Sequence, residues 1–282
     1  MYYPNQPDLG GKVVVITGGA GVLCSEFARA LAQCGAKVAI LNRTLSKAEA
    51  LAEEIRAAGG EAAAVQVDVT DSASVAAAHE AVLGIYGKCD ILINGAGGNN
   101  ARANTDKEYF EPGDLEAEVK SFFDLEEAGF RSVMDLNFVG TLLPTQAFAR
   151  DMLGRAGCCI LNVSSMNAYT PLTKIPAYSG AKAAVSNFTQ WLAVHFSKVG
   201  IRVNAIAPGF FSTEQNRTLL WNADGTPTAR SGKILAATPM GRFGEAEELL
   251  GALLFLVDEK SASFVTGVCI PVDGGFSAYS GV

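Results

Sequence analysis

The chain has 282 residues, of which 49% are hydrophobic and 18% charged, a composition that can bury a large core and is unlike that of a disordered protein. Its formal net charge of -7 argues against a nucleic-acid partner, because binding a phosphate backbone needs a basic face. The first residues lack the basic flank and apolar core of a signal peptide, and no apolar run reaches the length of a membrane span. We therefore expect a cytoplasmic protein with no membrane partner.

The residue types that form disulfides and metal sites are few and scattered. The six cysteines include no C-x-x-C pair, and several lie in apolar runs, which predicts free structural thiols in a reducing compartment. The two histidines, His79 and His195, fall on helical patterns away from strand ends, and no carboxylates cluster at ligand spacing. We predict no metal site.

Short β-branched runs alternate with longer stretches rich in alanine and leucine. Seven runs predict strands, and most lack a two-residue alternation, as expected for strands buried on both faces of a parallel sheet. They span residues 12–17, 37–42, 62–68, 90–94, 158–163, 201–206 and 267–272. Helices are predicted over 22–34 and 45–58, each followed by glycine, and Asp71 or Ser72 is expected to cap the next helix.

The order strand, helix, strand predicts an α/β fold, a Rossmann-type doubly wound parallel sheet of about seven strands with helices on both faces. Such sheets bind ligands beyond the carboxyl ends of their strands. Nothing in the sequence divides the chain, so residues 1–282 are expected to form a single domain. Two stretches interrupt the pattern, at about 98–123 and 212–244, and we interpret them as loops that contact the substrate.

The first predicted strand runs directly into the sequence TGGAGVL, and a helix opens behind it. Glycines at this position let the backbone approach a pyrophosphate, whose charge meets the free amides at the helix N-terminus. The placement after the first strand of a βαβ unit predicts a dinucleotide site, against the alternative of a purely structural turn.

The end of the second predicted strand bears on which dinucleotide binds. Asn42 and Arg43 stand where NAD-binding proteins of this architecture usually have an acidic residue, and an arginine suits the 2′-phosphate of NADP. We therefore favour NADP(H) as the cofactor, with NAD(H) as the alternative. The other interpretation of Arg43 is a solvated surface arginine with no role in binding. Asp68, at the end of the third strand, is expected to bond the adenine amino group or to serve as a turn residue.

Tyr178 and Lys182 are four residues apart in an alanine-rich helical stretch, so they share one helix face. An ammonium group beside the phenol and the positive nicotinamide ring are expected to lower the pKa of Tyr178 toward the working pH, as a proton donor in carbonyl reduction requires. Ser165, at the end of a strand, is suited to donate a hydrogen bond to a carbonyl oxygen as negative charge develops. The polar pair is predicted to face away from the densest packing, because another stripe of the helix is apolar. That stripe contains Val185, Phe188, Leu192, Phe196 and Val199, and Gly200 is expected to end the helix.

In this order and at this spacing, the motifs resemble the short-chain dehydrogenases/reductases along nearly the whole chain. The matching segments are TGGAGVL, NGAG (94–97), Asn137 in DLNFVG, Ser165, the motif from Tyr178 to Lys182, and PGFFST (208–213). The first loop departs from the family pattern T-G-x-x-x-G-x-G, because Val22 and Cys24 occupy the places of its last two glycines. NGAG likewise replaces the more frequent N-N-A-G.

The resemblance implies that Ser165, Tyr178, Lys182 and Asn137 are catalytic, with Lys182 also binding the nicotinamide ribose and Asn137 supporting a proton-relay water. It also implies a set of cofactor contacts. They are Gly18, Gly21, Val22, Leu23, Asn42, Arg43, Asp68, Val69, Asn94, Ala96, Tyr178, Lys182, Pro208, Phe211 and Thr213. Alternatively, Thr213 is expected to be the N-cap of a helix. Family members commonly form tetramers, so the apolar segment 265–282 is expected to pack on a partner subunit or on its own chain.

More narrowly, several segments resemble the branch described as D-mannonate oxidoreductases or fructuronate reductases, among them SFFDLEEAGF, TPLTKIPAYS and PGFFSTEQNR. The resemblance implies interconversion of a keto group and a hydroxyl on a six-carbon sugar acid, most readily fructuronate to D-mannonate. The alternatives are a gluconate 5-dehydrogenase-like or other polyol or ketone reductase and, in another class, a non-catalytic nucleotide-binding regulatory protein.

A sugar-acid substrate carries a carboxylate, which needs a cationic partner. We predict Lys174 and Arg217 for this role, with Arg102 and Lys107 in the first long loop as further candidates. Polar side chains in the same loops are predicted to bond sugar hydroxyls. They are Asn99, Asn100, Asn167 and Gln215.

Overall fold

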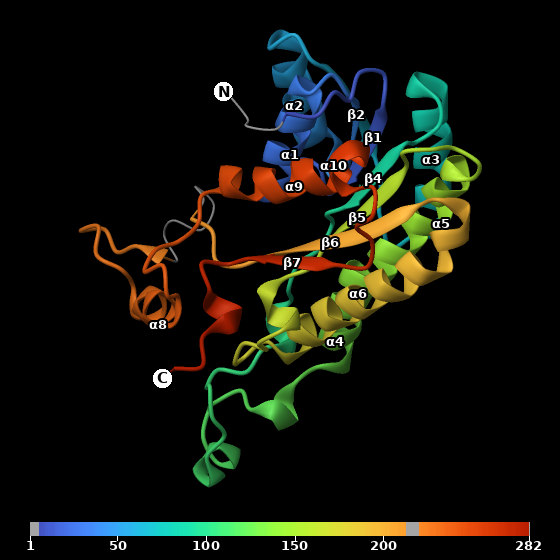
Figure 1. Cartoon of the computed structure of the whole chain (residues 1–282). Helices are drawn as coiled ribbons and strands as arrows, with labels where there is room; N and C mark the ends of the chain where they lie inside the picture. The colour runs from blue at the N-terminus through green and yellow to red at the C-terminus, as the bar shows by residue number, and fades with distance from the viewer. Residues whose placement is uncertain (1–5, 213–219, 282) are drawn as a thin grey trace.

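The computed structural model describes residues 6–212 and 220–281. Within these residues seven strands form one sheet in the order β3-β2-β1-β4-β5-β6-β7, and every neighbouring pair is parallel (Figure 1). The strands are β1 (Val13–Thr17), β2 (Lys37–Asn42), β3 (Glu61–Gln66), β4 (Ile91–Asn94), β5 (Cys159–Val163), β6 (Arg202–Pro208) and β7 (Cys269–Val272). The predicted fold class and all seven predicted strands are confirmed.

Helices cover both faces of the sheet (Figure 1). One face carries α1 (Val22–Gln33), α2 (Leu45–Ala57), α9 (Leu250–Val257) and α10 (Glu259–Ala262), and the other carries α3 (Ser72–Tyr86), α4 (Glu127–Met134), α5 (Gly140–Met152) and α6 (Pro176–His195). Short 3-10 turns lie at η1 (Ala101–Ala103), η2 (Pro112–Leu115), η3 (Phe122–Asp124), η5 (Met166–Ala168), η6 (Ser197–Val199), η7 (Ala246–Leu249) and η8 (Phe276–Ala278). A π-helical turn, η4 (Asp135–Val139), joins α4 to α5.

The helix ends follow the predicted signals. The glycines after α1 and α2, Gly35 and Gly59, have φ of 88° and 87°, a left-handed conformation that suits glycine and stops a helix. The side chain of Asp71 accepts a hydrogen bond from the Ala73 amide and so caps α3, as predicted.

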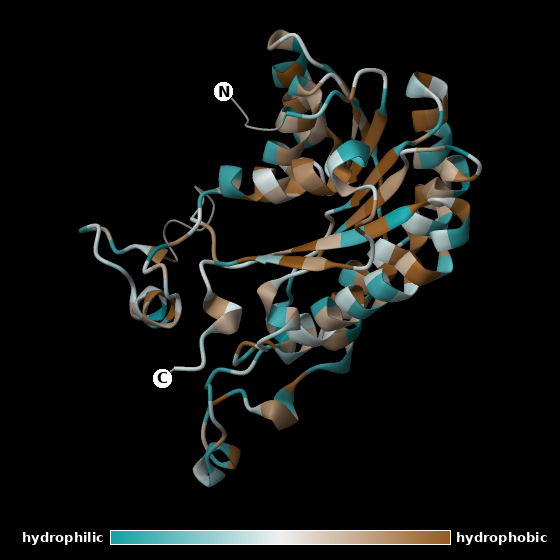
Figure 2. Cartoon of the chain, in the orientation of Figure 1, coloured by the Kyte–Doolittle hydropathy of each residue, from teal (hydrophilic) through white to brown (hydrophobic). Residues whose placement is uncertain are grey.

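Two apolar cores flank the sheet, because successive residues of a strand point to opposite faces. Val14 and Ile16 of β1 pack with α1, α2 and α9, whereas Val13 and Val15 pack with α3, α5 and α6. Figure 2 shows the strands as mostly hydrophobic, with a hydrophilic stretch in β6, while the outer faces of the helices are mostly hydrophilic. This double burial accounts for the missing alternation in the strand sequences.

Two expectations for α6 are wrong. The helix ends at His195 rather than at Gly200, and Val199 is 42% exposed in the following 3-10 turn. Lys182 does not face away from dense packing, since only 4% of it is exposed. The helix packs against β6 on one side and against α4 and η5 on others, so its polar side is covered as well as its apolar one.

The cysteines form no disulfide among the described residues. All six cysteines are free thiols and five are buried, as predicted.

Within 265–281, β7 extends the sheet beside β6, and the Tyr169 hydroxyl donates to the Cys269 carbonyl at 2.6 Å. This part of the segment therefore docks on its own chain. None of the described helices combines the length and the apolar character that crossing a bilayer requires.

Candidate active site

A cavity of about 890 Å³ opens beyond the carboxyl ends of the first four strands, where the strand order reverses between β1 and β4. Doubly wound sheets bind their ligands at such a switch point. The predicted cofactor residues Gly18, Gly21, Asn42, Arg43, Asp68, Val69 and Ala96 line this cavity. The predicted substrate residue Asn99 lines it too.

The residues around this cavity fit a dinucleotide. Gly21 is the N-cap of α1 and its helix has no side-chain cap, so backbone N–H groups at the helix start are free to meet a phosphate. Arg43 stands at the other end of the cavity, close enough to Asp68 to contribute to the lowered pKa of that carboxyl, although hydrogen bonds from Thr70 are the main cause. The site thus combines a turn whose backbone amides suit a phosphate with a cation, Arg43, that has no acidic neighbour on β2.

The two departures from the family motifs compensate each other in space. Cys24 is buried at the start of α1, and its sulfur lies against the backbone of Gly95 in the NGAG segment. A Cβ at position 95 would overlap Cys24 Sγ and come within 2.9 Å of the Thr17 carbonyl oxygen. An asparagine at 95, as in the more frequent N-N-A-G, is therefore incompatible with a cysteine at 24. Gly95 lines the cavity, and Cys24 does not.

Other predicted cofactor residues lie elsewhere. The Asn94 amide donates to Thr145 and Asn162, at 3.0 and 2.9 Å, and so ties β4 to α5 and β5 inside the core. Phe211 is buried and pairs with Gly244. Three more predicted residues do not line the large cavity: Val22 and Leu23 open α1, and Pro208 is the last residue of β6. Thr213 lies outside the described residues.

Ser165, Tyr178 and Lys182 come together where β5 ends and α6 begins. Lys182 Nζ donates to the carbonyl oxygen of Val163, the last residue of β5, at 2.8 Å. The same nitrogen lies 5.7 Å from the centroid of the Tyr178 ring. Ser165 is 8% exposed and is within hydrogen-bonding reach of the Tyr178 phenol. The predicted catalytic residues therefore form one cluster.

Asn137 is fully buried in the π-helical turn and holds the floor of the site. Its amide nitrogen donates to the carbonyls of Gly98 and Val133, at 2.7 and 2.8 Å, and its oxygen accepts from the Gly98 amide at 3.2 Å. A Cβ at Gly97 would lie 2.7 Å from Asn137 Oδ1 and 3.1 Å from Lys182 Nζ. Asn137 therefore fixes the loop after β4 directly against the Lys182 ammonium, at a kind of helix irregularity that is frequent at functional sites.

Burial controls the pKa values of the two central groups. Desolvation lowers the pKa of Lys182 to about 8, since a buried ammonium loses its hydration. Burial also raises the pKa of Tyr178, and the hydrogen bond from Ser165 offsets this only in part. In the protein by itself the Lys182 ammonium does not bring the pKa of Tyr178 down, because desolvation dominates; the contribution of the nicotinamide ring stays a prediction.

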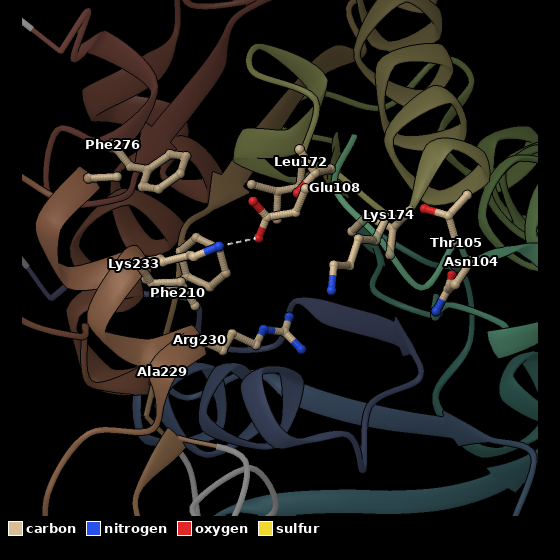
Figure 3. Close-up of a pocket in the computed structure, with 14 residues that line it drawn as sticks. Asn104, Thr105, Glu108, Leu172, Lys174, Phe210, Ala229, Arg230, Lys233 and Phe276 are labelled. Carbon is tan, nitrogen blue, oxygen red and sulfur yellow. Dashed lines mark hydrogen bonds and ion pairs between the residues drawn. The ribbon is translucent and has the colours of Figure 1, made fainter. Parts of the chain in front are cut away.

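A second cavity of about 520 Å³ lies between the first long loop, the loop before α6 and α8 (Ala229–Ala237). Its lining includes the predicted residue Lys174 together with Arg230, Lys233 and Glu108 (Figure 3). Lys174 has a φ of 71°, the left-handed region that a lysine seldom adopts, and its carbonyl accepts from the Thr105 amide at 2.9 Å. The backbone is thus held in a costly conformation where its side chain enters the cavity.

The remaining predicted substrate residues are dispersed. Asn167 is buried, and its Oδ1 has no hydrogen-bond partner among the described residues, whereas Asn100 donates to Ser132 at 2.8 Å. Arg102 and Lys107 are paired with carboxylates, Arg102 with Glu126 and Lys107 with two acidic side chains of its own loop. Arg217 and Gln215 lie outside the described residues.

Sequence reasoning missed Arg230 altogether. It identified the stretch 212–244 as substrate-contacting, yet nothing in the order of residues distinguishes Arg230 from a surface arginine. The signal available was Thr228, which caps α8 by accepting from the Ser231 amide at 3.3 Å and thereby marks where the helix begins.

Comparisons with known proteins agree with this geometry. A model of the short chain dehydrogenase family matches residues 12–223. An uncharacterized oxidoreductase of Haemophilus influenzae is 58% identical over 275 residues, which cover 98% of this chain and 96% of that protein. An uncharacterized oxidoreductase of Bacillus subtilis, called UxuB, is 57% identical over 279 residues, 99% of each chain.

Solved structures are similar over the same extent. A Haemophilus influenzae protein provisionally called a D-mannonate oxidoreductase, with bound NAD, superposes with a TM-score of 0.95 at 56% identity, covering 99% of each chain. A gluconate 5-dehydrogenase from Burkholderia cenocepacia, in complex with NADP and tartrate, superposes with a TM-score of 0.79 at 32% identity. The alignment with it covers 96% of this chain and 97% of the other.

Proposed function

The chain belongs to the short-chain dehydrogenase family and is an NAD(P)-dependent oxidoreductase, and from that premise we propose that it interconverts a keto group and a secondary alcohol on a sugar acid. The reaction we favour is the reduction of fructuronate to D-mannonate or its reverse. The observation that carries the reaction class is the cluster of Ser165, Tyr178 and Lys182 beside a cavity that fits a dinucleotide.

In this proposal each side chain acts on a defined atom. The bound nicotinamide supplies a hydride for reduction or accepts one in oxidation. Ser165 donates a hydrogen bond to the carbonyl oxygen, and Tyr178 protonates that oxygen as its negative charge grows. Lys182 remains anchored to Val163, where a positive charge stabilises the phenolate that Tyr178 leaves behind. Asn137 holds the loop of Gly97 and Gly98 in position for the cofactor.

The proposed cofactor preference rests on Arg43. It lines the cavity at the end of β2, and Asn42 beside it carries no charge to repel a 2′-phosphate. We infer that NADP(H) binds more tightly and that NAD(H) is also accepted, as the NAD in the Haemophilus relative supports. Replacing Arg43 with alanine is expected to weaken NADPH binding about tenfold and to leave NADH binding unchanged. Titrations of cofactor fluorescence measure both affinities, and equal losses for the two cofactors would refute the preference.

The proposed substrate is tested by a panel of keto acids and keto polyols, each assayed with NADH and with NADPH. Turnover of fructuronate or of D-mannonate with the highest kcat/KM is the expected result. Highest kcat/KM for a keto-gluconate favours the gluconate 5-dehydrogenase alternative, which the Burkholderia relative supports. Absence of turnover with every carbonyl and alcohol, combined with normal cofactor binding, would favour a non-catalytic regulatory protein.

Three further parts of the proposal concern the whole protein. We propose that residues 1–282 act as one domain, that the stretches 98–123 and 212–244 are substrate loops, and that the enzyme works in the cytoplasm as a homotetramer. The cavity-lining residues Thr105 and Arg230, one from each stretch, support the loop assignment. Light scattering of the purified protein tests the tetramer.

A further inference from the structure

The second cavity carries an excess of positive charge although the chain as a whole is acidic. Lys174, Arg230 and Lys233 line it with one carboxylate, Glu108, so three positive charges and one negative leave a net of +2. The formal charge of the whole chain is -7. A concentration of cations in one hollow of an acidic protein indicates that the hollow receives an anion.

The four charged groups divide into two pairs with different roles. Lys233 and Glu108 form an ion pair at 2.7 Å, which joins α8 to the first long loop and neutralises both charges. Figure 3 shows this pair at one side of the cavity, while the charged ends of Lys174 and Arg230 point toward each other across the open space. Within the described residues neither Lys174 nor Arg230 has a carboxylate partner in an ion pair.

The cavity also adjoins the reaction centre. The loop that presents Lys174 runs within two residues into α6, the helix that carries Tyr178. On the other side, Asn99 of the dinucleotide cavity donates to Asn104 of the second cavity at 3.0 Å, so the two cavities meet at this pair. A small substrate with its keto group near Tyr178 can therefore extend toward the cationic side chains.

Apolar side chains also line the cavity, and Figure 3 shows Phe210 and Phe276 beside Lys233 and Leu172 beside Glu108. The two phenyl rings pack edge to face with centroids 5.3 Å apart. These apolar side chains suit the C–H face of a carbon chain and offer nothing to a second charged group. The arrangement fits a compact substrate with one anionic end.

We propose that Arg230, together with Lys174, binds the carboxylate of the substrate and is the residue that sets the preference for sugar acids over neutral sugars. The inference rests on the proposed oxidoreductase function and assigns its substrate class to particular atoms. Arg230 offers a planar fork of N–H donors that matches a carboxylate, and Lys174 adds a point charge from the strained loop. Glu108 keeps Lys233 from competing for the same carboxylate.

Equilibrium binding tests this role without depending on turnover. The probes are D-mannonate and its uncharged amide, D-mannonamide, titrated by calorimetry into the full-length protein saturated with reduced cofactor, to which an alcohol cannot pass a hydride. The wild type is expected to bind the acid at least about tenfold more tightly than the amide, the order of one charge-assisted pair. Arg230→Gln is expected to abolish most of this difference by weakening acid binding alone, and Arg230→Lys to restore part of it.

Two further variants complete the design. Lys174→Gln is expected to weaken acid binding in the same selective way. Arg56→Gln is the matched control, because Arg56 pairs with Glu53 on α2 and lines neither cavity, so its loss removes the same charge elsewhere. An unchanged ratio of acid to amide affinity in Arg230→Gln would overturn the inference, as would a wild type that does not prefer the acid.

The same variants, assayed in addition for oxidation of D-mannonate with oxidised cofactor, separate this inference from the proposed function. If D-mannonate binds selectively through Arg230 but is not oxidised, the cationic pair stands and the proposed substrate is wrong. If D-mannonate is oxidised and Arg230→Gln keeps both its affinity and its KM, the proposed function stands and the inference fails.

Discussion

The reaction centre and the second cavity differ in how firmly the fold holds them. Ser165, Lys182 and Asn137 are buried and arise from the end of β5, from α6 and from the turn before α5, all parts of the sheet scaffold. Lys174, Arg230 and Lys233 are exposed and come from loops and from α8, beyond the edge of the sheet (Figure 1). The chemistry is thus built on rigid elements, whereas the substrate recognition that we propose lies on segments that can vary without disturbing the core.

The largest effect is expected at the reaction centre. Tyr178→Phe removes the proposed proton donor and is expected to lower kcat by about 10²–10⁴-fold with every substrate, acid or neutral. Cofactor binding, followed by fluorescence, should stay unchanged because the ring is kept. Turnover that survives at the wild-type rate would show that the mechanism proposed for this cluster is wrong.

Burial of the charged Lys182 side chain in the reaction centre lowers the free energy of unfolding. Its pKa is about 8 in the folded protein and about 10.4 in an unfolded chain, so between these values the unfolded state binds more protons and stability rises with pH. Below pH 8 the penalty of the buried charge is complete, up to about 3 kcal/mol in the free energy of unfolding. Replacing Lys182 with an uncharged residue removes this penalty. Part of the resulting gain in unfolding free energy is lost again, because the Val163 carbonyl loses its hydrogen-bond donor.

We therefore expect Lys182→Met to be inactive, and we expect its stability relative to the wild type to be highest at pH 7 and to fall as the pH rises toward 10. Urea unfolding at several pH values measures this difference. A difference in unfolding free energy that does not change between pH 7 and 10 would contradict the proposed desolvation of Lys182.

The contact between Cys24 and Gly95 tests the scaffold under the cofactor cavity. Gly95→Ala is expected to reduce the free energy of unfolding by about 1–3 kcal/mol, because the added methyl overlaps the cysteine sulfur. In a Cys24→Ala background the same change should cost less by about 1 kcal/mol or more. Gly84→Ala is the control, since a Cβ at that helical position meets nothing within 4 Å. Equal costs in both backgrounds would show that the two positions are not coupled.

The smallest effect is expected at the rim of the second cavity. Lys233→Met breaks the ion pair with Glu108, which joins an exposed lysine to a half-buried glutamate. We expect kcat to be unchanged and KM for a sugar acid to change by no more than about fivefold, as is usual for a partly exposed pair. A loss of kcat comparable to that of Tyr178→Phe would show that the second cavity also controls the chemical step at the reaction centre.

Much of the molecule follows from local patterns. The seven strands, the first two helices and the Asp71 cap were predictable because apolar runs and terminal residues act over a few positions. The cluster of Ser165, Tyr178 and Lys182 was predictable because helical spacing places two of its members on one face. The pKa values were not predictable, since they depend on how completely other elements bury the pair, and in the protein by itself burial raises the pKa of Tyr178.

The sequence alone determined the fold class, and it predicted the proposed dinucleotide site and the proposed catalytic side chains, because each rests on short motifs within single segments of the chain. The tertiary structure decided the relations between distant segments. It showed that Cys24 and Gly95 compensate each other and that Arg230 faces Lys174 across a cavity (Figure 3). Such pairings depend on packing among strands, helices and loops, and the periodicity of any single segment carries no information about them.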